Sequence, residues 1–290
     1  MKKLVILLCF ALFLVSKANA DGFVDSSGVF TLINTPGPGF QTQALGVNGL
    51  GQVVGFDSAG PFLLSNGTLT QLNLPGTPNG INNAGQIVFD GNSGIGFLDT
   101  GGHLTPLAFP GAIYSQPTGI SNNGLISGVY ELPGSSHLQS WVYSNGHFTP
   151  FNGPAGSIDT RIWGIDNGGE IVGTSFNGTT ITNFIYDDGK FINTGAAALL
   201  GVNDLEQVVG TVNGQGIVGN ADDFDDAKTF NVPGADSTVA KGINNKGEIV
   251  GVATFPLPPT NVPEPGTPLL LACGIGLLGI FYRNFRIRES

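Results

Sequence analysis

Cysteine is almost missing from this chain of 290 residues. Its two cysteines, Cys9 and Cys273, lie in apolar segments near the two ends, and none lies between them. This excludes disulfide bonds and cysteine-based zinc sites from the long middle of the chain. The stability of that region must therefore come from burial of apolar side chains and from strand pairing.

Positive charge is also scarce. Between Asp21 and Asn261 the sequence has 19 acidic and five basic residues, a net charge of −14. Nucleic acids require a basic surface, so we expect no nucleic-acid partner. We interpret the acidity as a solvated surface that keeps a glycine-rich chain soluble. The densest acidic run, from Asp222 to Asp226, does not have the spacing of a calcium loop; we favour an acidic loop tip there and leave calcium binding open.

Signatures of catalysis are missing as well. The chain has three histidines, His103, His137 and His147, and no His-Glu-x-x-His zinc motif. It has no Gly-x-Ser-x-Gly motif, which would present a serine nucleophile. We interpret His103 and His147 as exposed turn residues. We therefore expect no catalytic residue, no metal site and no cofactor, and we predict that the protein is not an enzyme.

A ten-residue phrase recurs six times between the apolar ends. It reads Gly, Ile or Val, then Asn, Asp or Ser, two variable residues, Gly, one variable residue, Ile or Val, Val and Gly, with small lapses. Successive copies begin 34, 39, 45, 37 and 41 residues apart, which is the period of a modular array. The copies begin at Gly46, Gly80, Gly119, Gly164, Gly201 and Gly242.

Each phrase predicts a β-hairpin. In the second copy Asn82 can start a tight turn by bonding to its own backbone, and Gly85 suits the left-handed position of that turn. Apolar residues stand on both sides of the turn, as in two short paired strands. The fifth copy has Glu206 in place of this glycine, and we expect a different turn there because a side chain would be strained.

A second hairpin follows each first one, for example from Phe62 to Leu72, so that each repeat holds four strands in about 39 residues, the size of a propeller blade. The N-terminal region, Gly22 to Leu32, has only a second hairpin, and the C-terminal region, Gly242 to Phe255, has only a first one. These halves complete one blade. We therefore predict an all-β fold, a six-bladed β-propeller closed by N- and C-terminal half-blades, with an open β-solenoid as the alternative.

The N-terminus predicts a secretory signal peptide. Two lysines precede an apolar run from Leu4 to Val15, and Ala18 and Ala20 form a small-x-small cleavage site. Asp21 would be the first residue of the mature chain. We divide the chain into a signal peptide (1–20), a repeat β-propeller domain (21–255), a proline-rich linker (256–262) and a C-terminal sorting segment (263–290).

The C-terminus carries a short motif, an apolar stretch and a basic tail, in that order. The stretch from Leu269 to Tyr282 has 14 residues, which as a helix would span about 21 Å. We expect a short transmembrane helix that crosses by local thinning of the bilayer and keeps the basic tail in the cytoplasm. The motif is Val262, Pro263, Glu264 and Pro265, and the tail contains Arg283, Arg286 and Arg288.

This arrangement resembles the PEP-CTERM sorting signal of Gram-negative bacteria that make exopolysaccharide. The resemblance implies that an exosortase, an intramembrane cysteine protease, reads the motif and removes the tail; a permanent anchor is the alternative. It also implies export by the secretion machinery, a transient stay in the inner membrane through the C-terminal helix, and a final place at the cell surface or outside the cell. The repeat phrase, clearest from Gly242 to Gly251, is similar to the bacterial extracellular HAF repeat.

We expect a non-enzymatic scaffold of the cell surface or extracellular matrix, with exopolysaccharide as a candidate partner. One alternative is a lectin-like propeller, for which Trp163, placed in a blade-linking segment, is the candidate ligand contact. A polysaccharide lyase or hydrolase with its site in the central channel is a further alternative. We attribute the aromatic residues that recur at the starts of second hairpins to packing between blades. They are Phe23, Phe62, Phe97, Trp141 and Phe184.

Overall fold

The structure is a computed structural model that describes residues 19–33 and 41–256. Contacts divide the chain into two units, Met1–Pro256 and Leu257–Ser290, and all described residues belong to the first. They form six four-stranded antiparallel sheets and a short 3-10 helix, η3 (Phe224–Asp226). No helix in this described part is long and apolar enough to cross a membrane. Most of the expected signal peptide and all of the expected C-terminal helix lie outside the described residues.

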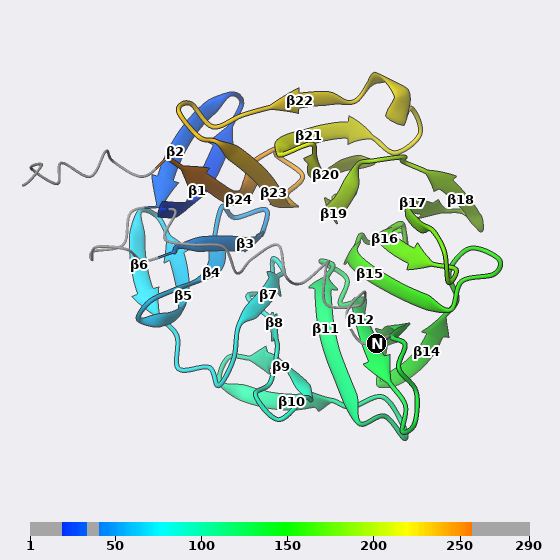
Figure 1. Ribbon diagram of the computed structural model, residues 1–290. Coiled ribbons are helices and arrows are strands. Elements are labelled where there is room, and N and C mark those ends of the chain that lie inside the picture. The colour runs from blue at the N-terminus through cyan, green and yellow to red at the C-terminus, as the bar shows by residue number, and fades with distance from the viewer. Residues whose placement is uncertain (1–18, 34–40, 257–290) are drawn as a thin grey trace, which may run out of the picture. The chain divides into compact units, whose positions relative to one another are not determined.

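The six sheets form a ring, and each sheet is one blade (Figure 1). Blade 1 starts at β3, blades 2 to 5 follow in chain order, and blade 6 contains both ends of the described chain. The innermost strands are β3 (Gln43–Val47), β7 (Pro78–Ile81), β11 (Tyr114–Ile120), β15 (Asp159–Ile165), β19 (Ala198–Val202) and β23 (Ser237–Ile243). The second strands are β4 (Val53–Asp57), β8 (Ile87–Phe89), β12 (Ile126–Glu131), β16 (Ile171–Phe176), β20 (Gln207–Val212) and β24 (Ile249–Phe255).

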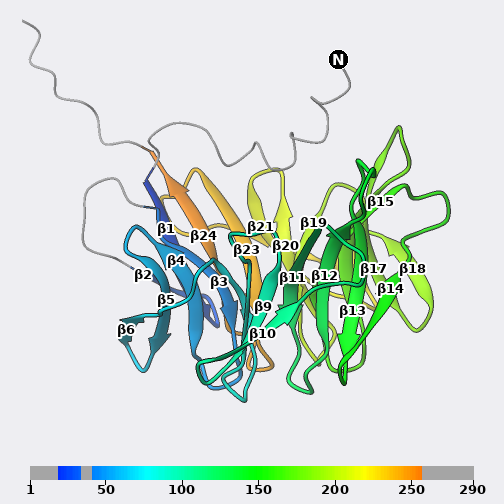
Figure 2. The ribbon, with the colours of Figure 1, turned by 90° about the horizontal axis from the view of Figure 1, so that it is seen from below.

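The outer half of each blade is the second predicted hairpin. The third strands are β5 (Gly60–Ser65), β9 (Gly96–Thr100), β13 (Gln139–Ser144), β17 (Ile181–Asp187), β21 (Gln215–Asn220) and β1 (Asn19–Ser26). The outermost strands are β6 (Thr68–Gln71), β10 (His103–Leu107), β14 (His147–Phe151), β18 (Lys190–Asn193), β22 (Lys228–Phe230) and β2 (Val29–Ile33). In Figure 2, which views the ring from the side, the strands stand roughly along its axis.

The predicted closure of the ring is confirmed. Blade 6 has the strand order β2-β1-β24-β23, so its outer half comes from the N-terminal region and its inner half from the C-terminal region. Strand β1 pairs with β24 over seven residue pairs, from Asn19 opposite Phe255 to Asp25 opposite Ile249. The six-bladed propeller is therefore closed by hydrogen bonds between strands more than 200 residues apart in the sequence.

The first strand also bears on the predicted cleavage site. Ala20 is buried in β1, and its carbonyl oxygen accepts a hydrogen bond from Thr42 N at 3.0 Å. Cleavage before Asp21 would remove these contacts and leave the pairs from Asp21 to Asp25 with β24 in place. Ala18 lies outside the described residues. The cleavage site stays a prediction.

The apolar core is distributed around the ring instead of gathered in one place. Six clusters of buried apolar side chains lie at the six interfaces between neighbouring blades. Between blades 2 and 3, for example, Val88 packs with Ile126 and Trp141. Between blades 6 and 1, Val250 packs with Val53 and Phe62. Each blade thus buries both faces against its neighbours, which a ring permits and an isolated blade does not.

The last glycine of the phrase makes room for the aromatic residue of the third strand. Gly128 lies opposite Trp141, and a Cβ at Gly128 would overlap the indole. The same relation holds for Gly55 with Phe62 and for Gly173 with Phe184. Four of the five recurring aromatic side chains have no exposed surface, which supports their role in packing.

Blade 2 shows what happens where the phrase lapses. Phe89 stands where other copies have the last glycine, and it lies opposite Phe97. The two rings stack with centroids 5.5 Å apart, and Phe97 is only half-buried. A side chain at this position therefore displaces the aromatic residue from the site it fills in other blades.

The expectation of a different turn in the fifth copy is wrong. Glu206 adopts φ 61°, close to the 75° of Gly85, and its N–H donates to Asn203 O at 3.1 Å as Gly85 N–H does to Asn82 O at 3.0 Å. The Asn203 side chain holds the turn, because its Oδ1 accepts from two backbone N–H groups and its Nδ2 donates to Gln207. These bonds outweigh the left-handed strain of a non-glycine residue, about 1–2 kcal/mol.

Candidate functional site

Each innermost strand has a β-bulge directly before the first glycine of the phrase. The pairing register shifts there in all six blades, so one residue per blade has no partner across the strand pair. Bulges redirect side chains and are frequent beside functional sites. We call these six residues the bulge ring. It consists of Leu45, Asn79, Thr118, Trp163, Leu200 and Lys241.

The bulge ring lines one mouth of a narrow central channel. The glycines that follow it stand in close succession around the axis: a Cβ at Gly46 would lie 2.9 Å from Gly80 Cα, and one at Gly242 would lie 3.5 Å from Gly46 Cα. The cavity between the bulge ring, these glycines and the next β-branched residues has a volume of about 80 Å³. A cavity that holds benzene has a volume of about 150 Å³, so this smaller cavity does not take in a whole sugar ring.

Trp163 lies within β15, so the prediction that it belongs to a blade-linking segment is wrong. The bulge takes Trp163 out of the pairing register but leaves it inside the strand. Its indole is held in place. Trp163 Nε1 donates to Thr174 Oγ1 at 3.3 Å, Thr174 Oγ1 donates to Asn183 Oδ1 at 3.1 Å, and Asn183 Nδ2 donates to Gly195 O at 3.1 Å. Trp163 is thus a half-buried, oriented aromatic residue at the channel mouth.

Two further side chains give this mouth its polar character. Burial lowers the pKa of Lys241 to about 8. Its neighbours in the bulge ring are Leu200 and Leu45, so the ring residues on both sides of Lys241 are apolar. Asn79 Nδ2 donates to Asp90 Oδ1 at 2.7 Å and to Pro117 O at 2.9 Å. Burial raises the pKa of Asp90 to about 6, and the bond from Asn79 opposes that rise.

The asparagines of the phrase lie at the opposite mouth and hold the blades together. Asn48 Nδ2 donates to Asn82 O at 3.0 Å in the next blade, and Asn82 Nδ2 donates to Ser121 O at 3.3 Å. Asn203 Nδ2 donates to Asn244 O, and Asn244 Nδ2 donates to Asn48 O, both at 2.8 Å. The repeated asparagine is therefore a clasp between blades, and its regularity reflects structure instead of ligand binding.

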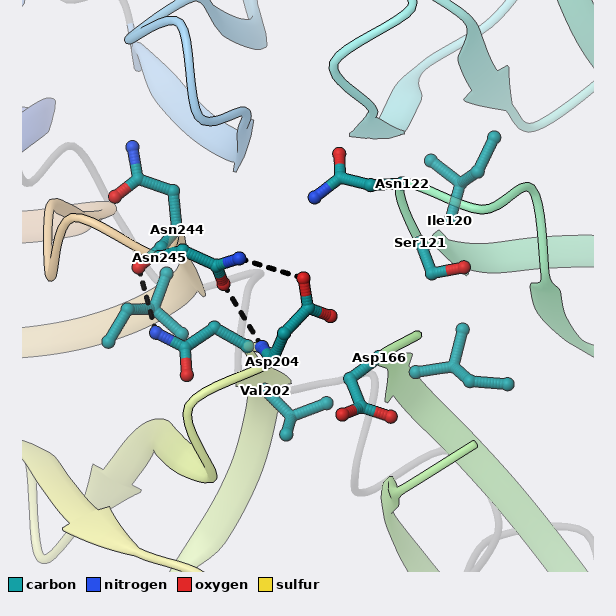
Figure 3. A pocket seen from close by; sticks show the side chains of 11 residues that line it. Ile120, Ser121, Asn122, Asp166, Val202, Asp204, Asn244 and Asn245 are labelled. Carbon is teal, nitrogen blue, oxygen red and sulfur yellow. Dashed lines mark hydrogen bonds between the residues drawn. The ribbon is translucent and has the colours of Figure 1, made fainter. Parts of the chain in front are cut away.

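A second set of bonds joins the next turn residues around the same mouth. Asp204 N donates to Asn245 Oδ1 at 3.0 Å, and Asn245 Nδ2 donates to Asp204 Oδ2 at 2.7 Å, as Figure 3 shows. Asn167 donates to both carboxylate oxygens of Asp204 from the other side. The cavity at this mouth has a volume of only about 50 Å³. The polar side chains that line this cavity mostly form hydrogen bonds with one another.

Blade 4 departs from this pattern and carries an acid pair. Three copies have Asn and Gln four residues apart with a hydrogen bond between them, such as Asn82 Nδ2 to Gln86 Oε1 at 2.8 Å. Blade 4 has Asp166 and Glu170 instead, and neither carboxylate can donate when ionised. Glu170 is 6% exposed, and its Oε1 has no hydrogen-bond partner. Burial, and then the charge of Asp166, raises the pKa of Glu170 to about 8.

Glu170→Gln is expected to stabilise the protein at pH 8 and to have little effect near pH 4. The folded-state pKa of Glu170 lies above the ordinary 4.5, so wild-type stability falls as pH rises from about 4.5 to about 8. The amide removes this loss and supplies a donor for Asp166. We expect a rise in Tm of roughly 5 °C at pH 8, on a scale of about 2–4 °C per kcal/mol. Thermal unfolding between pH 4 and pH 8.5 measures it.

Glu248→Gln is the matched control for this change, because Glu248 occupies the same turn position and already accepts from Asn244 Nδ2. It should give no gain at pH 8. The pKa values of Asp166 and Glu206 are also raised, so a smaller residual pH dependence is expected to persist in Glu170→Gln. An unchanged pH profile in that variant would contradict the assignment.

The other sequence-predicted residues fall in several places. His103 and His147 are exposed at the starts of β10 and β14. In the acidic run, Asp222 approaches Glu206, whose pKa is raised by a hydrogen bond and by the charge of Asp222. Among residues 19–33 and 41–256, no three His, Cys, Asp or Glu side chains are placed to hold a metal ion. The residues of the C-terminal motif and tail lie outside the described residues.

Sequence reasoning named Trp163 and missed Lys241, Asn79 and the ring to which they belong. The available signal was the residue before each first glycine. This position changes from copy to copy in a sequence whose neighbouring positions repeat. The structure brings these six residues together at one mouth, and residues of the asparagine turns line the cavity at the other mouth.

Solved structures of low sequence identity share the architecture. A TolB-type protein from Agrobacterium tumefaciens is 14% identical with a TM-score of 0.61, and the match covers 83% of this chain and all of that one. A gluconolactonase from Xanthomonas campestris is 12% identical with a TM-score of 0.50, covering 73% of this chain and 86% of that one. At such identities the likeness shows the fold alone. A search among curated proteins finds no match at the threshold applied.

Fold and comparisons together define the class: the chain is a closed six-bladed β-propeller. Residues 261–287 match the PEP-CTERM protein-sorting motif. The resemblance stated from the sequence is thereby confirmed for the sorting motif. This motif marks an exported protein of the cell envelope or surface that is recognised by an exosortase, a membrane protein.

Proposed function

We propose that this protein is a non-enzymatic scaffold of the cell surface or extracellular matrix in an exopolysaccharide-producing Gram-negative bacterium. The observation that carries the proposal is the order of two features along the chain. The propeller is closed by the pairing of β1 with β24, which ends at Phe255, and the sorting motif follows at 261–287. The N-terminal leader is removed on export, and the exosortase cuts the C-terminal segment after a transient stay in the inner membrane. The repeats, in this proposal, are of the extracellular HAF type.

The contacts made by the residues of the repeat support a structural role for the propeller. Its asparagines bind the next blade, and its glycines make room for neighbouring backbone and aromatic rings. Its channel cavities, about 50 and 80 Å³, are well below the roughly 300–1,000 Å³ of sites that enclose a small-molecule ligand. Both observations favour display of a surface over turnover of an enclosed substrate.

Processing at the motif is tested with an epitope tag placed after Ser290. When the full-length chain is produced together with an exosortase, the tag should be lost and the propeller released from the membrane fraction. A variant with Pro263, Glu264 and Pro265 changed to Ala should keep the tag. Changing Pro258 and Pro259 to Ala, just before the matched segment, is the control and should be processed normally. Tag loss without the exosortase, or tag retention with it, contradicts the proposal.

A second candidate function is lectin-like binding of a saccharide, and Trp163 favours it. The indole lies at the channel mouth and is fixed by three successive hydrogen bonds. Aromatic rings with one polar end held in place are suited to stack on sugars. A lyase or hydrolase with its site in the central channel remains the further alternative, and polysaccharide turnover assays are its test.

A further inference from the structure

The clasp between blades 4 and 5 lacks its hydrogen-bond donor. In four copies of the phrase an asparagine amide donates to the carbonyl oxygen of the equivalent residue in the next blade. Blade 4 has Asp166 at this position, and the equivalent residue of blade 5 is Asn203. Both residues line the small cavity at this mouth. An ionised carboxylate has no hydrogen to donate, so Asp166 cannot form the clasp of the other copies.

A second donor is missing in the same turn. In three copies the asparagine amide also donates to a glutamine four residues on, and in blade 6 Asn244 donates to Glu248. Blade 4 has Glu170 at that position, so Asp166 and Glu170 bring only acceptors to each other when ionised. Glu170 is 6% exposed, and its Oε1 has no hydrogen-bond partner. Oxygen atoms thus surround the place that an amide nitrogen takes in other blades.

We propose that this place is a cation site that takes Ca²⁺, with a carboxylate oxygen of Asp166, one of Glu170 and the main-chain oxygen of Asn203 as its protein ligands. Calcium binds oxygen and accepts carboxylates together with carbonyls. Buried charges are paired or coordinate a metal, and a cation between the two carboxylates meets that requirement. The site departs from the expectation of no metal site. It uses only two acidic side chains, so it is compatible with the absence of a suitable group of three in the described part of the chain.

The cavity beside Asp166 has room for the remaining ligands. Calcium takes about six to eight oxygen ligands, so water must complete the three that the protein supplies. The cavity has a volume of about 50 Å³, and one water molecule needs about 10–15 Å³. Asp204 lies at the same mouth (Figure 3), but its two carboxylate oxygens already accept from Asn167 and Asn245. Asp204 therefore adds negative charge beside the site and is not a ligand.

Three more carboxylates around Glu170 attract a cation. Asp187 ends β17 at the position opposite Glu170, one step beyond the pairing register of β16 with β17. The charges of Asp187, Glu206 and Asp222 each contribute to the raised pKa of Glu170, so they act on this side chain from both blades. A divalent cation relieves their mutual repulsion. With only three protein ligands we expect a dissociation constant of about 10⁻³ M, in the range of extracellular calcium modules.

Thermal unfolding of the full-length chain in detergent provides the test, in buffer of about pH 8 and about 0.15 M NaCl, which screens exposed charges. Calcium at about 10 mM, roughly ten times the expected dissociation constant, should raise Tm by about 3–6 °C over the value in EDTA. Magnesium at the same concentration should give no more than about half of that rise, because it demands a nearly ideal octahedral shell and gives up its water reluctantly.

Asp166→Asn and Glu170→Gln should each abolish the calcium response. Both substitutions restore an amide that other copies carry at the same position, so both variants are expected to fold. The gain predicted above for Glu170→Gln applies to calcium-free buffer. Glu248→Gln is the matched control in the equivalent turn, where an asparagine amide already serves the carboxylate, and it should keep the full response. Asp225→Asn alters the exposed acidic run and should keep it as well.

Three outcomes would overturn the site. An equal rise in the wild type, Asp166→Asn and Glu170→Gln would mean that calcium acts elsewhere on the acidic surface. A response that is lost in Asp225→Asn and kept in Glu170→Gln would place calcium in the acidic run. No rise in the wild type would mean that a proton, and not a cation, holds the two carboxylates together. None of these results bears on the sorted scaffold, which the epitope tag tests separately.

Discussion

A chain that ends at Asp236 is expected to show no cooperative unfolding transition. The truncation removes β23 and β24, the inner half of blade 6, and with them all seven residue pairs between β1 and β24. It also removes Ala240 and Val250 from the apolar clusters on both sides of that blade. Five blades would then be left with two open sheet edges in place of a closed ring. Circular dichroism during heating shows whether a cooperative unfolding transition is present.

A circular permutant separates loss of closure from disturbance of the termini. Asn19 and Phe255 are cross-strand partners, so a two-residue turn can join Phe255 to Asn19 and make blade 6 continuous. New termini opened between Ile33 and Gln41 leave every strand intact. This permutant should unfold in one transition near the wild-type Tm. A sharp transition in the truncated chain within about 10 °C of wild type would show that closure is dispensable, against this account.

Gly128→Ala is expected to be among the most damaging single substitutions in the propeller. A Cβ at this position would overlap the Trp141 indole and lie 2.6 Å from the carbonyl oxygen of Gln116. Trp141 has no exposed surface and donates from Nε1 to Val129 O at 3.1 Å, so it cannot move without breaking that bond. We expect a loss of about 3 kcal/mol, the upper part of the range for overpacked cores.

Gly124→Ala is the control for this substitution. Gly124 is in the turn of the same hairpin at φ +87°, and a Cβ there would meet nothing within 4 Å. Its cost is that of left-handed strain alone, about 1 kcal/mol. Chemical denaturation should therefore give a clearly lower free energy of unfolding for Gly128→Ala than for Gly124→Ala. Equal losses would mean that backbone conformation, and not the space beside Trp141, fixes the glycine at the end of the phrase.

The sequence determined the hairpins, the number of blades and the closure of the ring. Each of these follows from local patterns: Asn82 and Gly85 specify a turn among near neighbours, and the unmatched hairpins at Gly22 and Gly242 can be counted without knowing where they lie. Even so, the local argument failed at Glu206. There the hydrogen bonds of Asn203 hold the turn of the other copies against the preference of the residue.

Only the tertiary structure decided what the repeated residues are for. Asn244 Nδ2 reaches the carbonyl oxygen of Asn48, 196 residues away, and the six bulge residues meet at one mouth although they are dispersed along most of the chain. A turn is specified by residues that are adjacent in sequence, whereas a clasp or a channel mouth exists only after the ring has closed. Trp163 and Lys241 therefore line the same channel through the geometry of the ring, and nothing in their separate surroundings in the sequence relates them.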